Sequence, residues 1–183
     1  MEVIGETIDD AAGEAFDKIS KIMELPYPGG PLIDKYAREG NPEAYSFSHP
    51  KVGELEFSFS GLKTNVLRFL QKGVRRDKNF VLNNLNDISA SVQKTIVDIL
   101  MKKLELASKK TGIKNVAIAG GVSANSELRS RLLEKKKTGW KVFIPDFEFC
   151  TDNAAMIGVS GYYKFQKEIF VDQSVVANAR LKI

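Results

Sequence analysis

Apolar residues recur every three or four positions along much of the chain, a spacing typical of helices packed on one face. Over residues 7–23 this spacing predicts a helix, and Ile88, Val92 and Ile96 mark one face of a longer helix over about 85–110. Similar reasoning, helped by caps and glycine or proline breaks, predicts further helices. They cover residues 31–38, a segment that follows a turn at 60–64 and runs to about 71, and residues 126–137 and 152–165.

Three other segments have the pattern of strands. Between Ala44 and Ser60, apolar and polar residues alternate, which predicts a half-buried strand. Residues 115–119 and 140–144 are short apolar runs that flank a predicted helix. A strand-helix-strand unit places its two strands in parallel by default. The pattern therefore predicts a helix-rich α/β fold.

Composition restricts the chemistry that such a fold can perform. The chain has 183 residues, 27 Lys and Arg against 23 Asp and Glu, one cysteine and one histidine. A disulfide within the chain, a thiolate zinc cluster and an HExxH zinc site are therefore excluded. The net charge of +4 permits a phosphate or nucleic-acid partner without requiring one. No apolar run spans a membrane and the first residues lack a signal-peptide pattern, so we expect a cytoplasmic protein without a membrane partner.

An acidic stripe lies on the first predicted helix. Asp10, Glu14 and Asp17 are four and seven positions apart, which places three carboxylates on one helical face. Like charges at this spacing destabilise a helix, so a cation or a hydroxyl-rich ligand could be what they bind. The alternative is ordinary pairing of Glu14 with Lys18 and of Asp17 with Lys21, each four residues further on.

Two glycine-containing turns are candidates for binding a ligand through the backbone. Tyr27–Pro31 carries Gly29 and Gly30, and Ala119–Asn125 carries Gly120 and Gly121 after a buried strand. Paired glycines let a ligand approach the main chain, and a helix N-terminus favours anionic groups. Each segment could equally be a plain turn, the second with Asn125 as the helix N-cap.

The segment Phe149–Met156 offers one further carboxylate. Thr151 or Asp152 could cap the following helix, or Asp152 could be one oxygen ligand of a metal whose other ligands lie elsewhere. Cys150 is expected to be a small buried apolar residue, because no neighbouring histidine or lysine would activate its thiol.

The amino-acid sequences of five segments, and their order along the chain, resemble those of one known family. GETIDDAAGEAFDK (5–18), PYPGGP (26–31), FSFSGLKT (57–64), AGGVSAN (119–125) and FCTDNAAMI (149–157) together are similar to the tRNA N6-adenosine threonylcarbamoyltransferases. The resemblance runs over about residues 5–165. It implies the fold of the actin, sugar-kinase and heat-shock ATPase superfamily. It covers the C-terminal half of a typical member, so residues 1–183 would form the C-terminal lobe with a helical insertion.

The resemblance also implies a reaction. The complete enzyme would move a threonylcarbamoyl group from threonylcarbamoyl-adenylate to N6 of adenosine 37 in tRNAs that read codons starting with A. Asp17, Gly30 and Asn125 match positions that bind the nucleotide-like substrate, and Gly120 and Gly121 would flank the adenine.

Asp152 matches a ligand of one divalent metal ion per subunit, iron or zinc. The family's two metal-binding histidines belong to an HxxxH motif that this chain lacks, so we expect the chain alone to have little activity. Implied partners are tRNA, an adenine nucleotide and auxiliary subunits of a modification complex, and dimerisation is allowed.

Two other functions are compatible with these residues. The chain could be a non-catalytic module that binds a nucleotide or a partner subunit. It could also be a small-molecule kinase of the same superfamily, although it shows no phosphate loop of its own. A peptidase is disfavoured, because the sequence has no Ser-His-Asp arrangement and no zinc-protease motif.

Overall fold

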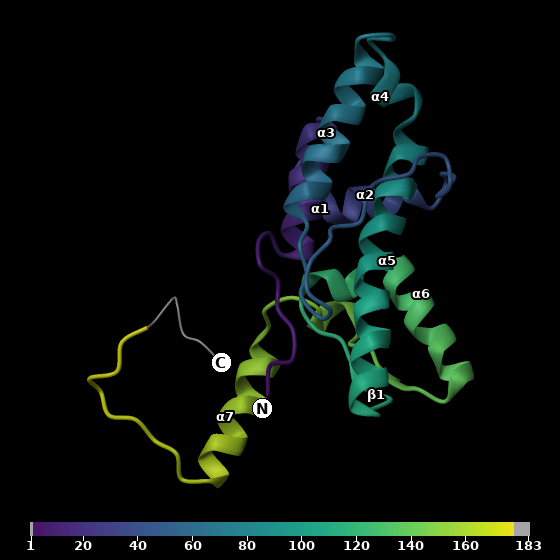
Figure 1. Ribbon diagram of the computed structural model, residues 1–183. Helices are drawn as coiled ribbons and strands as arrows, with labels where there is room; N and C mark the ends of the chain where they lie inside the picture. Colours follow the sequence, from purple (N-terminus) through teal and green to yellow (C-terminus); the bar gives the residue numbers. More distant parts are fainter. Residues whose placement is uncertain (1, 178–183) are drawn as a thin grey trace.

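A computed structural model describes residues 2–177 of the chain, which form seven α-helices, three short 3-10 helices and two strands. The helices lie in an elongated body, from which the last one projects (Figure 1). In chain order the α-helices are α1 (Ala12–Ile22), α2 (Gly29–Ala37), α3 (Ser60–Val74), α4 (Phe80–Asn83), α5 (Leu85–Thr111), α6 (Ser126–Lys135) and α7 (Ala154–Gln166). The strands are β1 (Asn115–Ala117) and β2 (Lys141–Phe143).

The larger hydrophobic core lies among α1, α2, α3 and the first half of α5. Ile19, Ile33, Val66 and Ile96 are fully buried there, and each comes from a different helix. Burying a branched aliphatic side chain stabilises the fold by about 1.5–3 kcal/mol. The four helices therefore form one packed unit that fixes the turn between α1 and α2.

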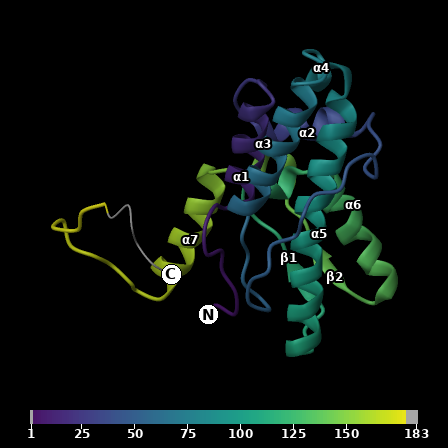
Figure 2. The ribbon, with the colours of Figure 1, turned by 45° about the horizontal axis from the view of Figure 1, so that its top comes forward.

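A smaller core joins the second half of α5 to the sheet and α6. Strands β1 and β2 pair in parallel, with Val116 opposite Val142, as the strand-helix-strand pattern predicts. These two valines pack with Met101 of α5 and Leu132 of α6. Helix α5 thus contributes to both cores. It runs from α4 past the two strands (Figure 2).

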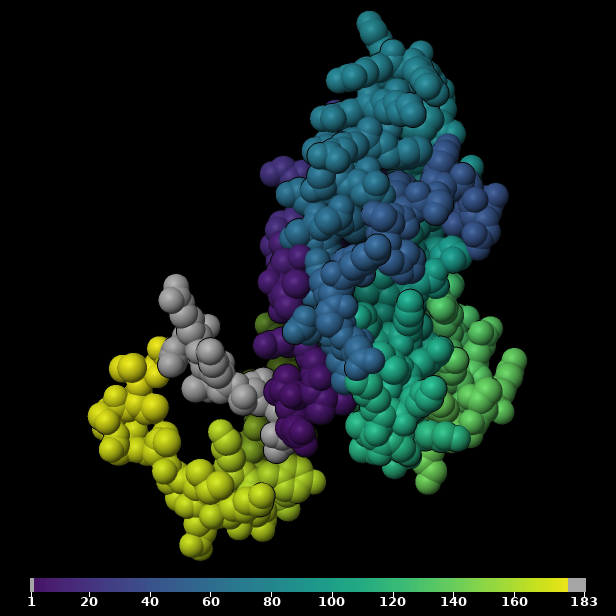
Figure 3. All heavy atoms as spheres, in the orientation of Figure 1, coloured from purple at the N-terminus to yellow at the C-terminus, as the bar shows by residue number. Residues whose placement is uncertain are grey.

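Helix α7 stands apart from both cores. None of its side chains is buried, and Ile157, Tyr163 and Phe165 are each more than half exposed. The space-filling view shows the helix beside the body (Figure 3). In the chain it follows β2 after a linking segment with one 3-10 turn. No helix in the described range 2–177 is both long and apolar enough to cross a membrane.

Two expectations about elements are wrong. Helix α1 begins at Ala12 instead of near residue 7, because Asp9 is held at the N-terminus of α3. The expected strand over 44–60 is absent: within the described residues this segment makes a single bridge, between Phe57 and Thr7. The expected alternation of burial is also lost, since Ser58 and Phe59 are both buried, and no neighbouring strand completes a ladder.

The other expected helices are present with shifted ends. Helix α2 starts at Gly29, α3 continues to Val74 and α6 stops at Lys135 before a 3-10 turn. The short helix α4, which was not expected, closes a hairpin between α3 and α5. The predicted helix-rich α/β class is confirmed.

Candidate functional site

Helix α2 lies at the centre of the predicted substrate residues. The carboxylate of Asp17 on α1 accepts hydrogen bonds from the backbone N–H groups of Gly29 and Gly30, at 2.8 and 3.2 Å. Both bonds reach Oδ1, and no hydrogen bond in the described part of the chain reaches Oδ2. Asp17 therefore caps α2 and keeps one oxygen free to accept from a ligand. The alternative pairing of Asp17 with Lys21 is absent from these residues, since Lys21 forms no ion pair there.

Gly29 and Gly30 have different structural roles. A β-carbon at Gly29 would lie 1.6 Å from Oγ of Ser20, whereas one at Gly30 would meet nothing closer than 3.8 Å. Gly29 is thus required for close packing of α2 on α1. Gly30 leaves its backbone open at the surface, as a position that contacts a ligand would require.

The second glycine turn lies against α1. Gly120 has a φ of 80°, and β-carbons at Gly120 or Gly121 would meet nothing within 4 Å. Val122 packs against Gly13, whose own β-carbon would be 3.4 Å from it. The turn therefore packs directly on the face of α1 that carries Gly13. The exposed backbone at Gly120 and Gly121 is compatible with the predicted ligand contact.

Asn125 is the N-cap of α6, as one of its two predicted roles requires. Its Oδ1 accepts from the N–H of Leu128 at 3.0 Å, while its Nδ2 donates to Oε1 of Gln93 at 2.7 Å. The Nδ2 also lies 3.4 Å from Oδ1 of Asp34. Asn125 is only 8% exposed. A ligand in this arrangement would therefore contact the residues around Asn125 more than the side-chain amide of Asn125 itself.

Asp34 on α2 is a buried carboxylate that sequence reasoning missed. Its Oδ1 accepts from the N–H and the hydroxyl of Ser126, at 3.1 and 2.6 Å, and its Oδ2 accepts from Arg38 at 2.9 Å. A buried charge must be paired in this way to be tolerated. One helix, α2, therefore connects Asp17 and Gly30 on one side with Asn125 on the other.

The acidic stripe divides into two parts. Lys18 bridges Asp10 and Glu14, at 2.5 and 2.7 Å, which confirms the expected pair with Glu14. Hydrogen bonds to Asp10 and then to Glu14 raise the pKa of Lys18. Asp10 and Glu14 are thereby neutralised, and only Asp17 faces α2.

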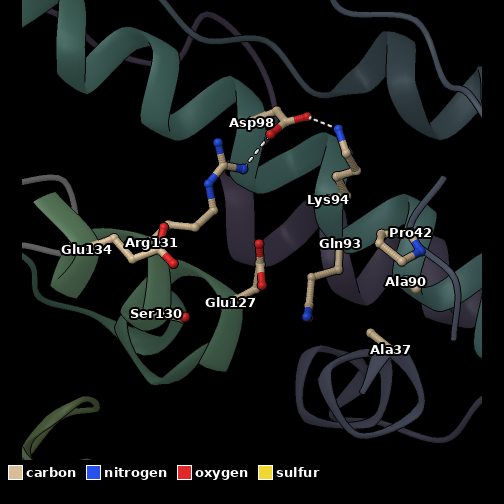
Figure 4. Close-up of a pocket in the computed structure, with 10 residues that line it drawn as sticks. All are labelled: Ala37, Pro42, Ala90, Gln93, Lys94, Asp98, Glu127, Ser130, Arg131 and Glu134. Atoms are coloured by element: carbon tan, nitrogen blue, oxygen red, sulfur yellow. Dashed lines mark hydrogen bonds and ion pairs between the residues drawn. The ribbon is translucent and has the colours of Figure 1, made fainter. Parts of the chain in front are cut away.

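A cavity of about 470 Å³ lies beside this network, between α2, α5 and α6 (Figure 4). Within it, Asp98 forms ion pairs with Lys94, at 2.7 Å, and with Arg131. Partial burial would raise the pKa of Asp98, but hydrogen bonds from Lys94 and Arg131 lower it below its ordinary value. Gln93 lines the same cavity and also accepts the hydrogen bond from Asn125, so the cavity adjoins the Asn125 network.

The predicted metal ligand lies apart from these residues. Asp152 is exposed in the segment before α7, and the cap of that helix is Asn153, whose Oδ1 accepts from Met156 at 2.9 Å. The expectation that Thr151 or Asp152 caps the helix is therefore wrong. Across residues 2–177, no three His, Cys, Asp or Glu side chains gather as a metal site would require. One carboxylate does not hold a divalent ion, so these residues alone do not fit the implied metal. Cys150 is buried, as expected.

Comparison with known proteins adds an independent observation. The sequence profile of the family described as tRNA N6-adenosine threonylcarbamoyltransferase matches residues 1–159. Relatives with that name are 62% identical in Christiangramia forsetii, 53% in Riemerella anatipestifer and 43% in Thermotoga neapolitana, over this whole chain. The chain spans about half of each relative's length, 54% for the first two and 55% for the third.

Proposed function

Because this chain belongs to the tRNA N6-adenosine threonylcarbamoyltransferase family, we propose that it supplies the nucleotide-binding part of an enzyme that modifies tRNA. The enzyme would transfer a threonylcarbamoyl group from threonylcarbamoyl-adenylate to N6 of an adenosine. A new N–C bond forms at N6, the bond from the carbamoyl carbon to the bridging phosphate oxygen breaks, AMP leaves with that oxygen and N6 releases a proton.

The observation that carries this proposal is the convergence of separate elements on helix α2. Asp17 caps the helix through Oδ1, Gly30 leaves open backbone beside it, and Asp34 connects the helix to Asn125 and Ser126. The free oxygen of Asp17 is an acceptor for ribose hydroxyls. The exposed turn at Gly120 and Gly121 has no side chains of its own to keep a base from its backbone.

The remaining parts of the proposal follow from the family resemblance. Residues 1–183 would form the C-terminal lobe of an actin-like ATPase fold. The single carboxylate of Asp152 would be one of several ligands of the enzyme's metal. Since the described residues do not hold a metal by themselves, we expect the isolated chain to show little transfer activity.

Nucleotide binding is the step of the proposed function that can be measured with this chain alone. In Asp17→Asn, the carboxamide oxygen can still accept from Gly29 and Gly30, while the free acceptor becomes an amide nitrogen. Loss of a charged hydrogen bond is worth about 1.5–3 kcal/mol, so we expect affinity for a threonylcarbamoyl-adenylate analogue to fall about tenfold to a hundredfold. Isothermal titration calorimetry would measure it.

The matched control is Asp146→Asn, the same change at an exposed loop residue outside the site. We expect it to bind as the unsubstituted chain does. If the chain binds no adenine nucleotide, or if both variants bind equally well, the nucleotide-site proposal is wrong and a partner-binding module becomes the better explanation.

A further inference from the structure

We propose that the tip of the α3–α4 hairpin is a docking surface for the phosphate backbone of tRNA. The choice of tRNA rests on the proposed function, whereas the surface itself is defined by the structure. The basic tip consists of five exposed side chains, which are Arg68, Lys72, Arg75, Arg76 and Lys78. It lies at the end of the body farthest from β1 (Figure 1).

The cations form a stripe along the end of α3. Arg68, Lys72 and Arg75 are spaced four and three residues apart, which places them on one helical face. None of the ion pairs in residues 2–177 involves the basic tip. Like charges at this spacing destabilise a helix, and the helix dipole offsets this only in the last turn. An anionic partner would account for the whole stripe.

The one acidic residue in this stretch is turned away from the cations. Oδ1 of Asp77 accepts from the N–H of Asn79 at 2.9 Å, and Oδ2 accepts from Nδ2 of Asn83 at 3.1 Å. The carboxylate thus stabilises the turn into α4 and makes no ion pair with Arg76 or Lys78. The positive field of the tip remains available to a ligand.

An apolar groove lies directly beside the cations. A cavity of about 820 Å³ runs between the end of α1 and the α3–α4 hairpin, with Arg75 and Lys78 among its lining residues. Val74 and Leu82 also line it, and Leu82 is 73% exposed. Phosphates can contact the cationic rim while a ribose or base covers the apolar side chains. This pairing of charge and apolar surface favours nucleic acid over a purely ionic partner.

Close packing holds the backbone of the hairpin that carries the cations. Phe69 of α3 packs against Phe80 of α4 and Tyr45, with ring centroids 5.6 and 4.7 Å apart. Gly73 fits closely under Phe80, since a β-carbon there would lie 2.2 Å from the ring. A preformed backbone confines the loss of conformational freedom on docking to the cationic side chains.

The test compares two triple variants with the same change of charge. Arg75→Gln, Arg76→Gln and Lys78→Gln together neutralise the tip. Lys109→Gln, Lys136→Gln and Lys137→Gln neutralise exposed cations at the opposite end of α5 and after α6. Binding of the 183-residue chain to unmodified tRNA would be measured by fluorescence anisotropy over about 50–200 mM salt. Thermal melting followed by circular dichroism would verify that both variants fold.

We expect the tip variant to bind tRNA about tenfold or more weakly. The slope of log affinity against log salt should become shallower by about two to three, since each phosphate contact contributes roughly 0.9. The control should keep the original slope. Leu82→Ser should weaken binding without changing the slope, because that contact is apolar.

Equal losses in the two triple variants would mean non-specific attraction and would overturn the docking surface. So would binding of the tip to phosphatidylserine vesicles without binding to tRNA. The tip variant should bind the threonylcarbamoyl-adenylate analogue normally. A chain that binds tRNA through the tip but no nucleotide would overturn only the proposed function, and the reverse result would overturn only this inference.

Discussion

Aspartates from other elements accept hydrogen bonds from the N-terminal amides of three helices of this protein. Asp9 accepts from the backbone of Phe59 and Ser60 at the start of α3, Asp17 does so for α2, and Asp34 does so for α6 at Ser126. Neither α2 nor α3 has a side-chain cap of its own. Each carboxylate therefore satisfies helix amides and fixes one element against another.

The contribution of Asp9 to stability is expected to depend on pH, which allows its capping role to be tested. Partial burial would raise its pKa, but hydrogen bonds from Ser58, Phe59 and Ser60 lower it below the ordinary value. The contribution of the carboxylate to stability is thus fully present above the unfolded pKa, about 3.9, and is lost as pH falls through the lower folded value.

We expect Asp9→Ala to reduce the free energy of unfolding by about 1–2 kcal/mol at neutral pH. The difference from the unsubstituted chain should shrink below about pH 4. Urea denaturation followed by circular dichroism at several pH values would measure both effects. Asp146→Ala, at an exposed loop, should cost little at any pH, and a constant deficit in Asp9→Ala would contradict the role of the charge.

Elements whose apolar residues recur with a strong periodicity could be predicted from the sequence. Features that depend on partners far away in the chain could not. Helix α5 and the parallel pair β1–β2 follow directly from their apolar patterns. The segment 44–60 has the alternation of a strand but no strand beside it to bond with. Asp34 was missed because its partner Ser126 is 92 residues away. Asp17 and Gly30 were singled out as site residues, but their mutual contact was not foreseen.

The packing of α1 against α2 can be tested with a compensating pair of changes. Gly29→Ala places a methyl group on Ser20, which is 2% exposed, so we expect a loss of about 1–3 kcal/mol in stability. Adding Ser20→Gly removes the clashing atoms at a cost of up to about 1 kcal/mol for glycine in a helix. Chemical denaturation of both single variants and the double variant would measure the coupling. Purely additive losses would show that the two positions do not compete for the same space.

At the scale of the whole molecule, the body contains two cores that share α5, and α7 lies outside both. Its exposed apolar residues follow one another over three turns. They are Met156, Ile157, Val159, Tyr162, Tyr163 and Phe165. Contiguous apolar surface of this kind promotes association in water.

Charges on α7 should therefore make the isolated chain less prone to associate. We expect Ile157→Glu with Phe165→Glu to lower binding of a hydrophobic fluorescent dye and to reduce light scattering with concentration. Because neither side chain is buried, stability should change by no more than about 0.5 kcal/mol. Ser160→Glu with Gln166→Glu adds the same charge to the same helix. If this control suppresses scattering equally, net charge is responsible instead of apolar surface.

The anchoring of α2 at both of its faces has a thermodynamic consequence. Its first turn is fixed to α1 by Asp17, and Asp34 fixes it to the start of α6. The candidate-site residues on either side of α2 are therefore already held in place before a ligand binds. A ligand that binds there would lose its own translational and rotational freedom. The protein would lose little conformational entropy on binding, because these residues are already ordered.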